Sequence, residues 1–162
     1  FAGLALAAVH TLLLHRLEMG DFTPDLYSVF ALYIGLFASR TGRYTPCLVL
    51  GLIRDFFSIG LLGSYGVLYS LLHKAAERAR GKFDPERPLN LLLMAAAGTF
   101  LVNFGYHSML VVGGDGIGWS RAIIRCACTA IASAPVAVLV LPLFTFTLSR
   151  LGISRAGGYW NF

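Results

Sequence analysis

The stretch Gly51-Leu52-Ile53-Arg54-Asp55-Phe56-Phe57-Ser58-Ile59-Gly60-Leu61-Leu62-Gly63 places a pair of opposite charges inside an otherwise apolar run. An ionisable side chain in hydrocarbon is costly unless it has a partner. Successive residues of a helix point about 100° apart, so Arg54 and Asp55 need not pair with each other and can face different partners. The glycines after Ser58 are the turn signal, and they predict a break between two helices. One long bent helix is the alternative.

The composition around this stretch is that of a membrane protein. The chain has 162 residues, of which 57% are hydrophobic and 13% charged, and its mean hydropathy is +0.71. Soluble domains are about half apolar and a quarter charged. A spanning helix needs about 20 residues, so this length holds five or six spans and excludes a separate soluble catalytic domain. We expect an all-α polytopic membrane protein, with residues 1–162 as a single domain of about six transmembrane helices in one bundle.

Six apolar blocks give the expected helices. The second, third and fourth are shorter than about 20 residues, so each must tilt, borrow flanking residues or lie inside the bundle. The first block has no basic segment before it and the chain begins at Phe1, which we interpret as a first transmembrane helix whose N-terminal part is missing. The blocks are residues 1–14, 26–38, 46–59, 61–72, 89–112 and 123–148.

Lysine and arginine residues between the blocks predict the orientation, because basic loops stay on the cytoplasmic side. The basic loop 73–88, the segment with Arg40 and Arg43, and the C-terminal tail fall on one side, so both termini are expected in the cytoplasm. Arg121 and Arg125 are the exception, since they lie near the outer start of the last span. A short amphipathic outer segment over residues 119–126, with Trp119 as an interfacial anchor, would accommodate them.

Further polar residues interrupt the last two spans. Asn103 and His107 are four residues apart and share a helix face, where they either join helices by hydrogen bonds or line a small cavity. Pro135 and Pro142 predict a kink in the last span. The three cysteines all lie in or beside apolar blocks and are expected to be structural thiols.

Catalytic motifs are not found in the sequence. It has no Gly-x-Ser-x-Gly elbow, no paired histidines at metal-ligand spacing and no glycine-rich phosphate loop with a lysine. We therefore expect no enzyme activity, no cofactor and no metal. The positive charge lies between apolar blocks, which favours a role in membrane orientation over nucleic-acid binding.

Residues 24–75 resemble the family of rod shape-determining protein MreD. In that family a Pro-Asp pair precedes a helix, and a Gly-Leu-x-x-Asp segment leads into a Leu-Gly turn. This chain has Pro24-Asp25, then Tyr33-Ile34-Gly35-Leu36-Phe37, then Gly51-Leu52-Ile53-Arg54-Asp55 and Leu62-Gly63 in the same order. Arg54 departs from the apolar residue expected before the aspartate.

The resemblance implies a scaffold subunit of the bacterial rod complex, or elongasome, in the inner membrane. Such a subunit binds MreC and through it associates with MreB, RodA and a class B penicillin-binding protein, to direct lateral peptidoglycan synthesis and cell shape. It also implies a six-helix fold like the S-component of energy-coupling-factor transporters. Asp25 and Asp55 would order the outer ends of the second and third spans, and apolar helix faces with an outer groove would hold the MreC segment. The matching positions are Pro24, Asp25, Gly51, Asp55 and Gly63.

A second hypothesis is a solute-binding membrane module of a transporter, like an S-component. Arg54, Asp55, Asn103 and His107 would then line a partly polar pocket. The resemblance favours the scaffold, whereas the residues alone leave the two hypotheses nearly even. Homodimerisation, the helix face that meets a partner, and a lipid inside the bundle are left open by the sequence.

Overall fold

A computed structural model describes residues 22–37, 44–58, 62–80, 82–84, 87–114, 118–150, 155–156 and 159–160. These residues form five α-helices and two short strands, which are α2 (Leu26–Phe37), α3 (Thr45–Phe57), α4 (Ser64–Arg80), α5 (Pro88–Val112), α6 (Trp119–Arg150), β1 (Arg155–Ala156) and β2 (Tyr159–Trp160). The strands pair antiparallel. The first expected helix, residues 1–14, lies outside the described residues, as do Arg40 and Arg43.

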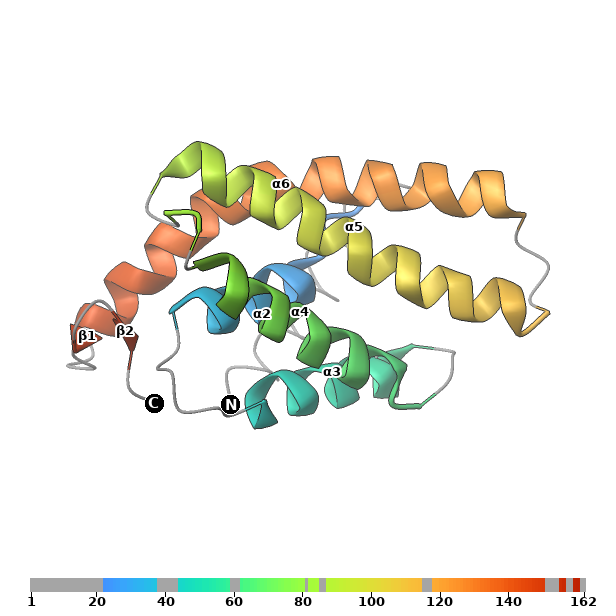
Figure 1. Cartoon of the computed structure of the whole chain (residues 1–162), viewed down its shortest axis with the longest axis horizontal. Coiled ribbons are helices and arrows are strands. Elements are labelled where there is room, and N and C mark those ends of the chain that lie inside the picture. The colour runs from blue at the N-terminus through green and yellow to red at the C-terminus, as the bar shows by residue number, and fades with distance from the viewer. Residues whose placement is uncertain are drawn as a thin grey trace.

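Helix α2 is the centre of the bundle. It contacts α3, α4, α5 and α6, and ten of its twelve residues are buried. Figure 1 shows it between the α3–α4 pair and the α5–α6 pair. Its sequence is apolar almost without interruption, and a helix that is apolar on all sides is stable only where neighbours or lipid surround it.

The structure agrees with the predicted class, an all-α membrane protein. Two helical segments are long and apolar enough to cross a membrane, Pro88–Val112 and Trp119–Leu143. Helices α2, α3 and α4 have 12, 13 and 17 residues, fewer than the roughly 20 that cross a bilayer. The described part of the chain does not bear out six spans or the S-component-like architecture.

The break within the charged stretch is confirmed, and the alternative of one long bent helix is wrong. Helix α3 ends at Phe57 and α4 begins at Ser64. Gly63 has φ +94°, a backbone conformation that glycine adopts without steric cost. The two helices pack against each other as a hairpin.

Two predicted boundaries are wrong. Helix α4 continues to Arg80, so the first half of the expected loop 73–88 is helical, because that half is rich in strong helix formers and its His73 and Ala76 are buried. Residues 119–126 are not a separate segment either, since they are the first turns of α6. Ala122, Cys126 and Ala130 are buried at four-residue intervals, which gives these turns the same core-facing stripe as the rest of the helix.

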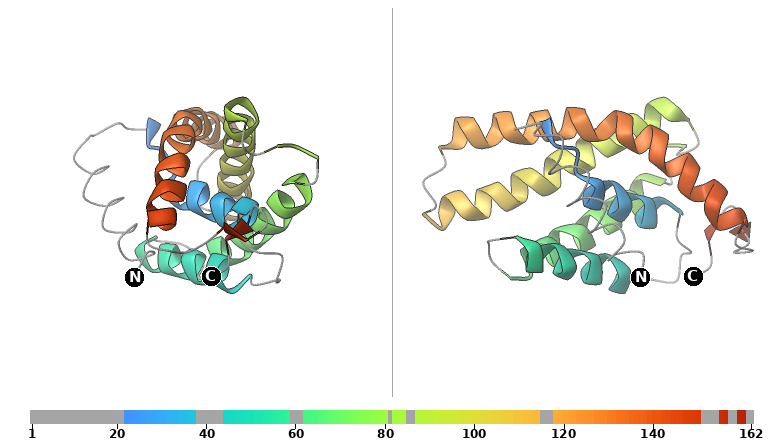
Figure 2. Two further views of the ribbon diagram at one scale, coloured as in Figure 1. Left: turned by 90° about the vertical axis from the view of Figure 1, so that its left-hand side faces the viewer. Right: turned by 180° about the vertical axis from the view of Figure 1, so that it is seen from behind.

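Helix α6 changes direction along its length, as the sequence predicts. Figure 2 shows the bend in the C-terminal half of the helix. Pro135 and Pro142 lie inside this helix. Each lacks the amide hydrogen of an α-helical bond and crowds the preceding turn, which is the usual cause of a sharp kink.

Gly51 of α3 permits the close approach of α3 to α4, where it faces Gly66. A Cβ placed on Gly51 would lie 2.4 Å from the Cα of Gly66, whereas a Cβ placed on Gly66 meets the Leu48 carbonyl oxygen at 3.5 Å. The first distance is far inside van der Waals contact and involves backbone, so the helices would have to separate. The second is an ordinary contact.

The Gly51→Ala variant should therefore be less stable than the wild type by about 1–3 kcal/mol, the usual cost of overpacking. Gly66→Ala is the matched control on the facing helix and should be nearly neutral. Thermal unfolding of both variants in detergent micelles measures the difference. Equal unfolding temperatures would contradict the close approach of α3 and α4.

Candidate functional site

Asp25 is the centre of a buried polar cluster. It directly precedes α2 and is 2% exposed. Its carboxylate accepts hydrogen bonds from the Ser28 N–H at 3.2 Å and the Ser28 hydroxyl at 2.6 Å, which caps the first turn of α2 in the way that aspartate favours. Pro24, the preceding residue, has no N–H and holds φ in the range that suits an entry to a helix.

Arg54 from α3 pairs with this carboxylate. Its Nη1 lies 2.6 Å from both Asp25 carboxylate oxygens, and it also donates to the Tyr69 hydroxyl. The guanidinium lies over the Tyr65 ring, 3.9 Å from the ring centroid, and its side chain is 16% exposed. The ion pair and the aromatic contact together compensate for the removal of both charges from water.

Asn103 and Ser133 connect the remaining helices to the same point. The Asn103 side-chain amide donates to Asp25 Oδ2 at 3.1 Å and to the Thr99 carbonyl at 2.9 Å. The Asp25 N–H donates to the Ser133 hydroxyl at 2.7 Å. Because Tyr69 belongs to α4, the cluster joins all five described helices.

Asp55, the neighbour of Arg54, has different partners. Its carboxylate accepts bonds from the Gly63 N–H at 3.0 Å, the Tyr65 N–H at 3.3 Å and the Ser64 hydroxyl at 3.3 Å. These contacts satisfy backbone donors at the start of α4. The expectation that Arg54 and Asp55 face different partners agrees with this geometry, and Asp55 orders the α3–α4 turn.

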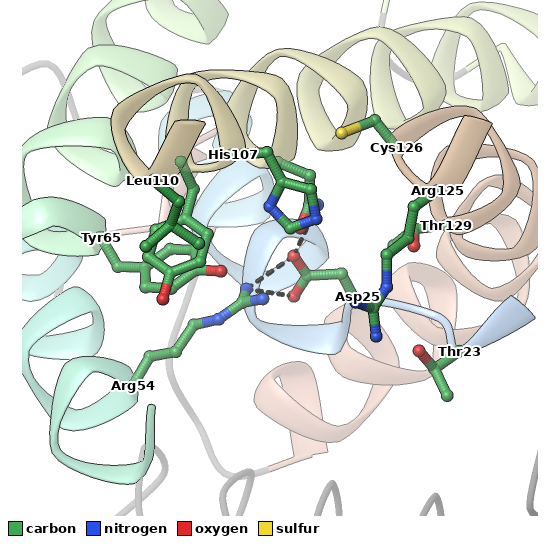
Figure 3. A pocket seen from close by; sticks show the side chains of 11 residues that line it. Thr23, Asp25, Arg54, Tyr65, His107, Leu110, Arg125, Cys126 and Thr129 are labelled. Atoms are coloured by element: carbon green, nitrogen blue, oxygen red, sulfur yellow. Dashed lines mark hydrogen bonds and ion pairs between the residues drawn. The ribbon is translucent and has the colours of Figure 1, made fainter. Parts of the chain in front are cut away.

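A cavity of about 290 Å³ lies beside the polar cluster. Figure 3 shows Arg54 and Arg125 approaching it from different sides with Asp25 between them, and the His107 ring projecting from α5. The Nδ1 atom of His107 is buried and has no hydrogen-bond partner among the described residues. The lining residues are Thr23, Asp25, Arg54, Tyr65, Asn103, Tyr106, His107, Leu110, Arg125, Cys126 and Thr129.

The structure brings together only part of the residue set that the sequence proposed. Asp25, Arg54, Asn103 and His107 share the cavity, whereas Asp55 is absent from its lining. The other three matching positions have backbone roles: Gly51 lies at a helix crossing, Gly63 in a turn, and Pro24 ahead of a cap.

Sequence reasoning missed the tyrosines and the contributions of α6. Tyr65 and Tyr69 lie one helical turn apart, a spacing that places both on one face of α4. The sequence does single out Arg125, because its positive charge lies on the expected outer side, where basic residues are unexpected. Nothing in the sequence singles out Ser133, because it is 108 residues from Asp25, its hydrogen-bond partner.

The cluster is suited to holding helices together. Among the described residues, no three histidine, cysteine, aspartate or glutamate side chains gather as a metal site. The carboxylate of Asp25 is engaged by Arg54, Asn103 and Ser28. A buried carboxylate with this many donors is held in its charged form and joins the elements that supply them.

One comparison with known proteins gives a match. The model of the family described as rod shape-determining protein MreD matches residues 3–151. The match covers all five described helices, α2 to α6. No curated protein and no solved structure matches the chain.

Replacing Asp25 with asparagine should destabilise the protein by about 3–5 kcal/mol, because Arg54 keeps its buried charge and loses its counter-ion. Asp84→Asn is the control, since Asp84 is 56% exposed and lies 3.8 Å from Arg87 in a surface ion pair, which contributes little. Thermal unfolding in detergent measures both variants. An Asp25→Asn protein as stable as Asp84→Asn would show that the pair does not hold the bundle.

Proposed function

The chain belongs to the family of rod shape-determining protein MreD, and we propose that it is the membrane scaffold subunit of a bacterial rod complex that binds MreC. The observation that carries the proposal is the family match over residues 3–151. The family is one of shape-determining membrane proteins, and the two long apolar helices are consistent with that. Through MreC the subunit would act with MreB, RodA and a class B penicillin-binding protein in lateral peptidoglycan synthesis.

The polar cluster supports a scaffold role. A subunit that positions other proteins in a membrane needs helices with a fixed relative arrangement. Arg54 and Asn103 both donate hydrogen bonds to the Asp25 carboxylate, and these bonds connect the start of α2 to α3 and α5. We propose that this rigidity, without catalytic chemistry, is what the subunit contributes to the complex.

The outward surfaces are suited to contacts with lipid and with another protein's helix. Large apolar side chains are exposed on each of α3, α4, α5 and α6, and they include Phe56, Val67, Leu101 and Leu139. Lipid tails are as apolar as the helix surfaces, so the hydrophobic effect does not drive helix association within a membrane. Association depends instead on close packing and on small or polar residues. We propose that MreC binds through such helix faces.

The distribution of charge supports a multi-pass orientation. In Figure 1 the end of α4 and the start of α5 lie at the opposite end of the bundle from the end of α5 and the start of α6. Lys74, Arg78, Arg80, Lys82 and Arg87 all belong to the former region. Because basic residues favour the cytoplasmic side, we propose that this end is cytoplasmic and that the Asp25 cluster lies toward the outer side of the inner membrane. Both termini would then be cytoplasmic.

The solute-binding alternative depends on the same cavity. Arg54, Asn103 and His107 line it as that hypothesis requires, but Asp55 does not. Nothing in the comparisons supports a transporter assignment, so we keep this alternative only as one outcome of the affinity-purification experiment.

Affinity purification of the tagged chain from its native membrane, followed by mass spectrometry, tests the proposal. We expect MreC and proteins of peptidoglycan synthesis to co-purify. Asp55→Ala should lower MreC recovery several-fold, because it removes the acceptor that orders the α3–α4 turn. Asp55→Asn keeps an acceptor oxygen and should retain most of the recovery.

A topology reporter should show normal insertion of both variants, since neither changes the basic residues. Normal MreC recovery with Asp55→Ala would refute the role of the turn. An ATPase-linked transport subunit in place of MreC would contradict the scaffold proposal itself and favour a solute-binding module.

A further inference from the structure

The hairpin of α3 and α4 stops short of its neighbours along the bundle. Figures 1 and 2 both show the end of α3 and the start of α4 set back from the end of α5 and the start of α6. A contact between side chains agrees with the pictures. The hydroxyl of Ser58, the residue after α3, lies 3.0 Å from the Tyr106 hydroxyl on α5. Tyr106 precedes the end of α5 at Val112 by about 9 Å of helical rise.

The exposed charges nearest to the turn lie at the far end of α4. Residues 56–73 include no lysine, arginine, aspartate or glutamate, and Lys74 is the next charged residue. It is exposed and lies about 15 Å from the start of α4 at Ser64 by the helical rise. The hydrocarbon core of a bilayer is about 30 Å thick. A hairpin with Lys74 at one membrane surface therefore ends inside the core.

The surface at the end of the hairpin is made of large apolar side chains. Phe56, Phe57 and Leu62, which we call the hairpin tip, are 80%, 67% and 74% exposed. Exposed apolar side chains that gather in this way mark a surface that meets a membrane or another protein. A partner helix within a membrane packs best against small or polar residues, and the hairpin tip contains none. Lipid acyl chains suit it better.

The turn between α5 and α6 has a different character. Gly113 and Gly114 are exposed, and Asp115 follows them in the sequence. Trp119 at the start of α6 is also exposed, and tryptophan is enriched where a membrane meets water. These residues suit a turn at the membrane surface, whereas the hairpin tip lies deeper.

Polar groups of the α3–α4 turn are satisfied within the protein. Hydrocarbon supplies no hydrogen bonds, so irregular backbone at this depth is tolerated only where the protein provides them. The Asp55 carboxylate accepts bonds from the N–H groups of Gly63 and Tyr65, and its main-chain carbonyl accepts one from the Ser58 N–H at 3.2 Å. Asp55 itself is buried. The described part of the turn therefore does not need water.

We propose that the α3–α4 hairpin enters the membrane from the side of Lys74 and turns back within it, so that the hairpin tip contacts lipid acyl chains. The depth of the tip favours acyl chains over lipid headgroups. A hairpin that returns to its own side does not cross the membrane, so it leaves the two ends of the bundle on the sides assigned above. That the side of Lys74 is cytoplasmic rests on the proposed function, whereas the depth of the tip does not.

Tryptophan fluorescence of the full-length chain in phosphatidylcholine vesicles tests the depth of the tip. Trp119 and Trp160 are replaced with phenylalanine, and a single tryptophan is introduced by Leu62→Trp or by Val112→Trp. Val112 at the end of α5 is the matched control, because it is 82% exposed and Leu62 is 74% exposed. The quenchers are phospholipids brominated on the acyl chain and aqueous iodide on both sides of the membrane.

We expect brominated acyl chains to quench Leu62→Trp strongly, and iodide to quench it several-fold less than Val112→Trp. Circular dichroism checks that the variants are folded. Phe57→Trp places the probe on the other helix of the hairpin and should give the same result, so the test does not depend on the folding of one variant.

Equal quenching of Leu62→Trp and Val112→Trp by iodide would overturn the proposal, because the tip would then lie at the water surface. Protection of Leu62→Trp and Phe57→Trp from both quenchers would also overturn it, since protein would then cover the tip. These measurements involve no MreC, so their failure is distinct from a failure of the scaffold proposal.

Discussion

The ion pair between Asp25 and Arg54 is the constraint on which the rest of the structure depends. Two charges taken out of water are stable only when each is close to the other and its remaining hydrogen-bonding groups are satisfied. Asp25 therefore also requires Ser28 and Asn103, and Arg54 requires the tyrosines of α4. These partners lie on different helices, so satisfying one carboxylate fixes the relative positions of α2, α3, α4 and α5. Ser133 adds α6 through the backbone of the same residue.

This arrangement compensates for helices that are short for a membrane. Helices α2, α3 and α4 have fewer residues than a bilayer crossing needs, and they are held by contacts with one another. Gly51 permits the close approach of α3 to α4, and Asp55 closes the turn between them. A bundle fixed in this way can present the same outward faces to a partner, which is the property that the proposed role in the rod complex requires.

Hydrophobicity and turn chemistry were enough to predict most helix positions and the break at Gly63. Residue spacing also showed that Arg54 and Asp55 could have separate partners. The identity of those partners was beyond the sequence, because Asp25 and Arg54 are 29 residues apart and any buried acid could have been the counter-ion. Hydropathy alone does not predict the helix end at Arg80, because the segment after Leu72 is charged. Its alanine, lysine, glutamate and arginine residues nevertheless all favour helix. Arg125 was noticed as an exception to the charge pattern, but its place beside the cavity required the packing of α6 on α5.

A double-mutant cycle of Asp25→Asn and Arg54→Gln tests the central claim most directly. The free energies of unfolding of the wild type, both single variants and the double variant would be measured in the same detergent. If the pair holds the bundle, the double variant should be more stable than the sum of the single effects predicts, by about 0.5–3 kcal/mol, the coupling typical of residues in contact. Additive losses, agreeing within about 0.5 kcal/mol, would show that the two charges act independently and would contradict the account.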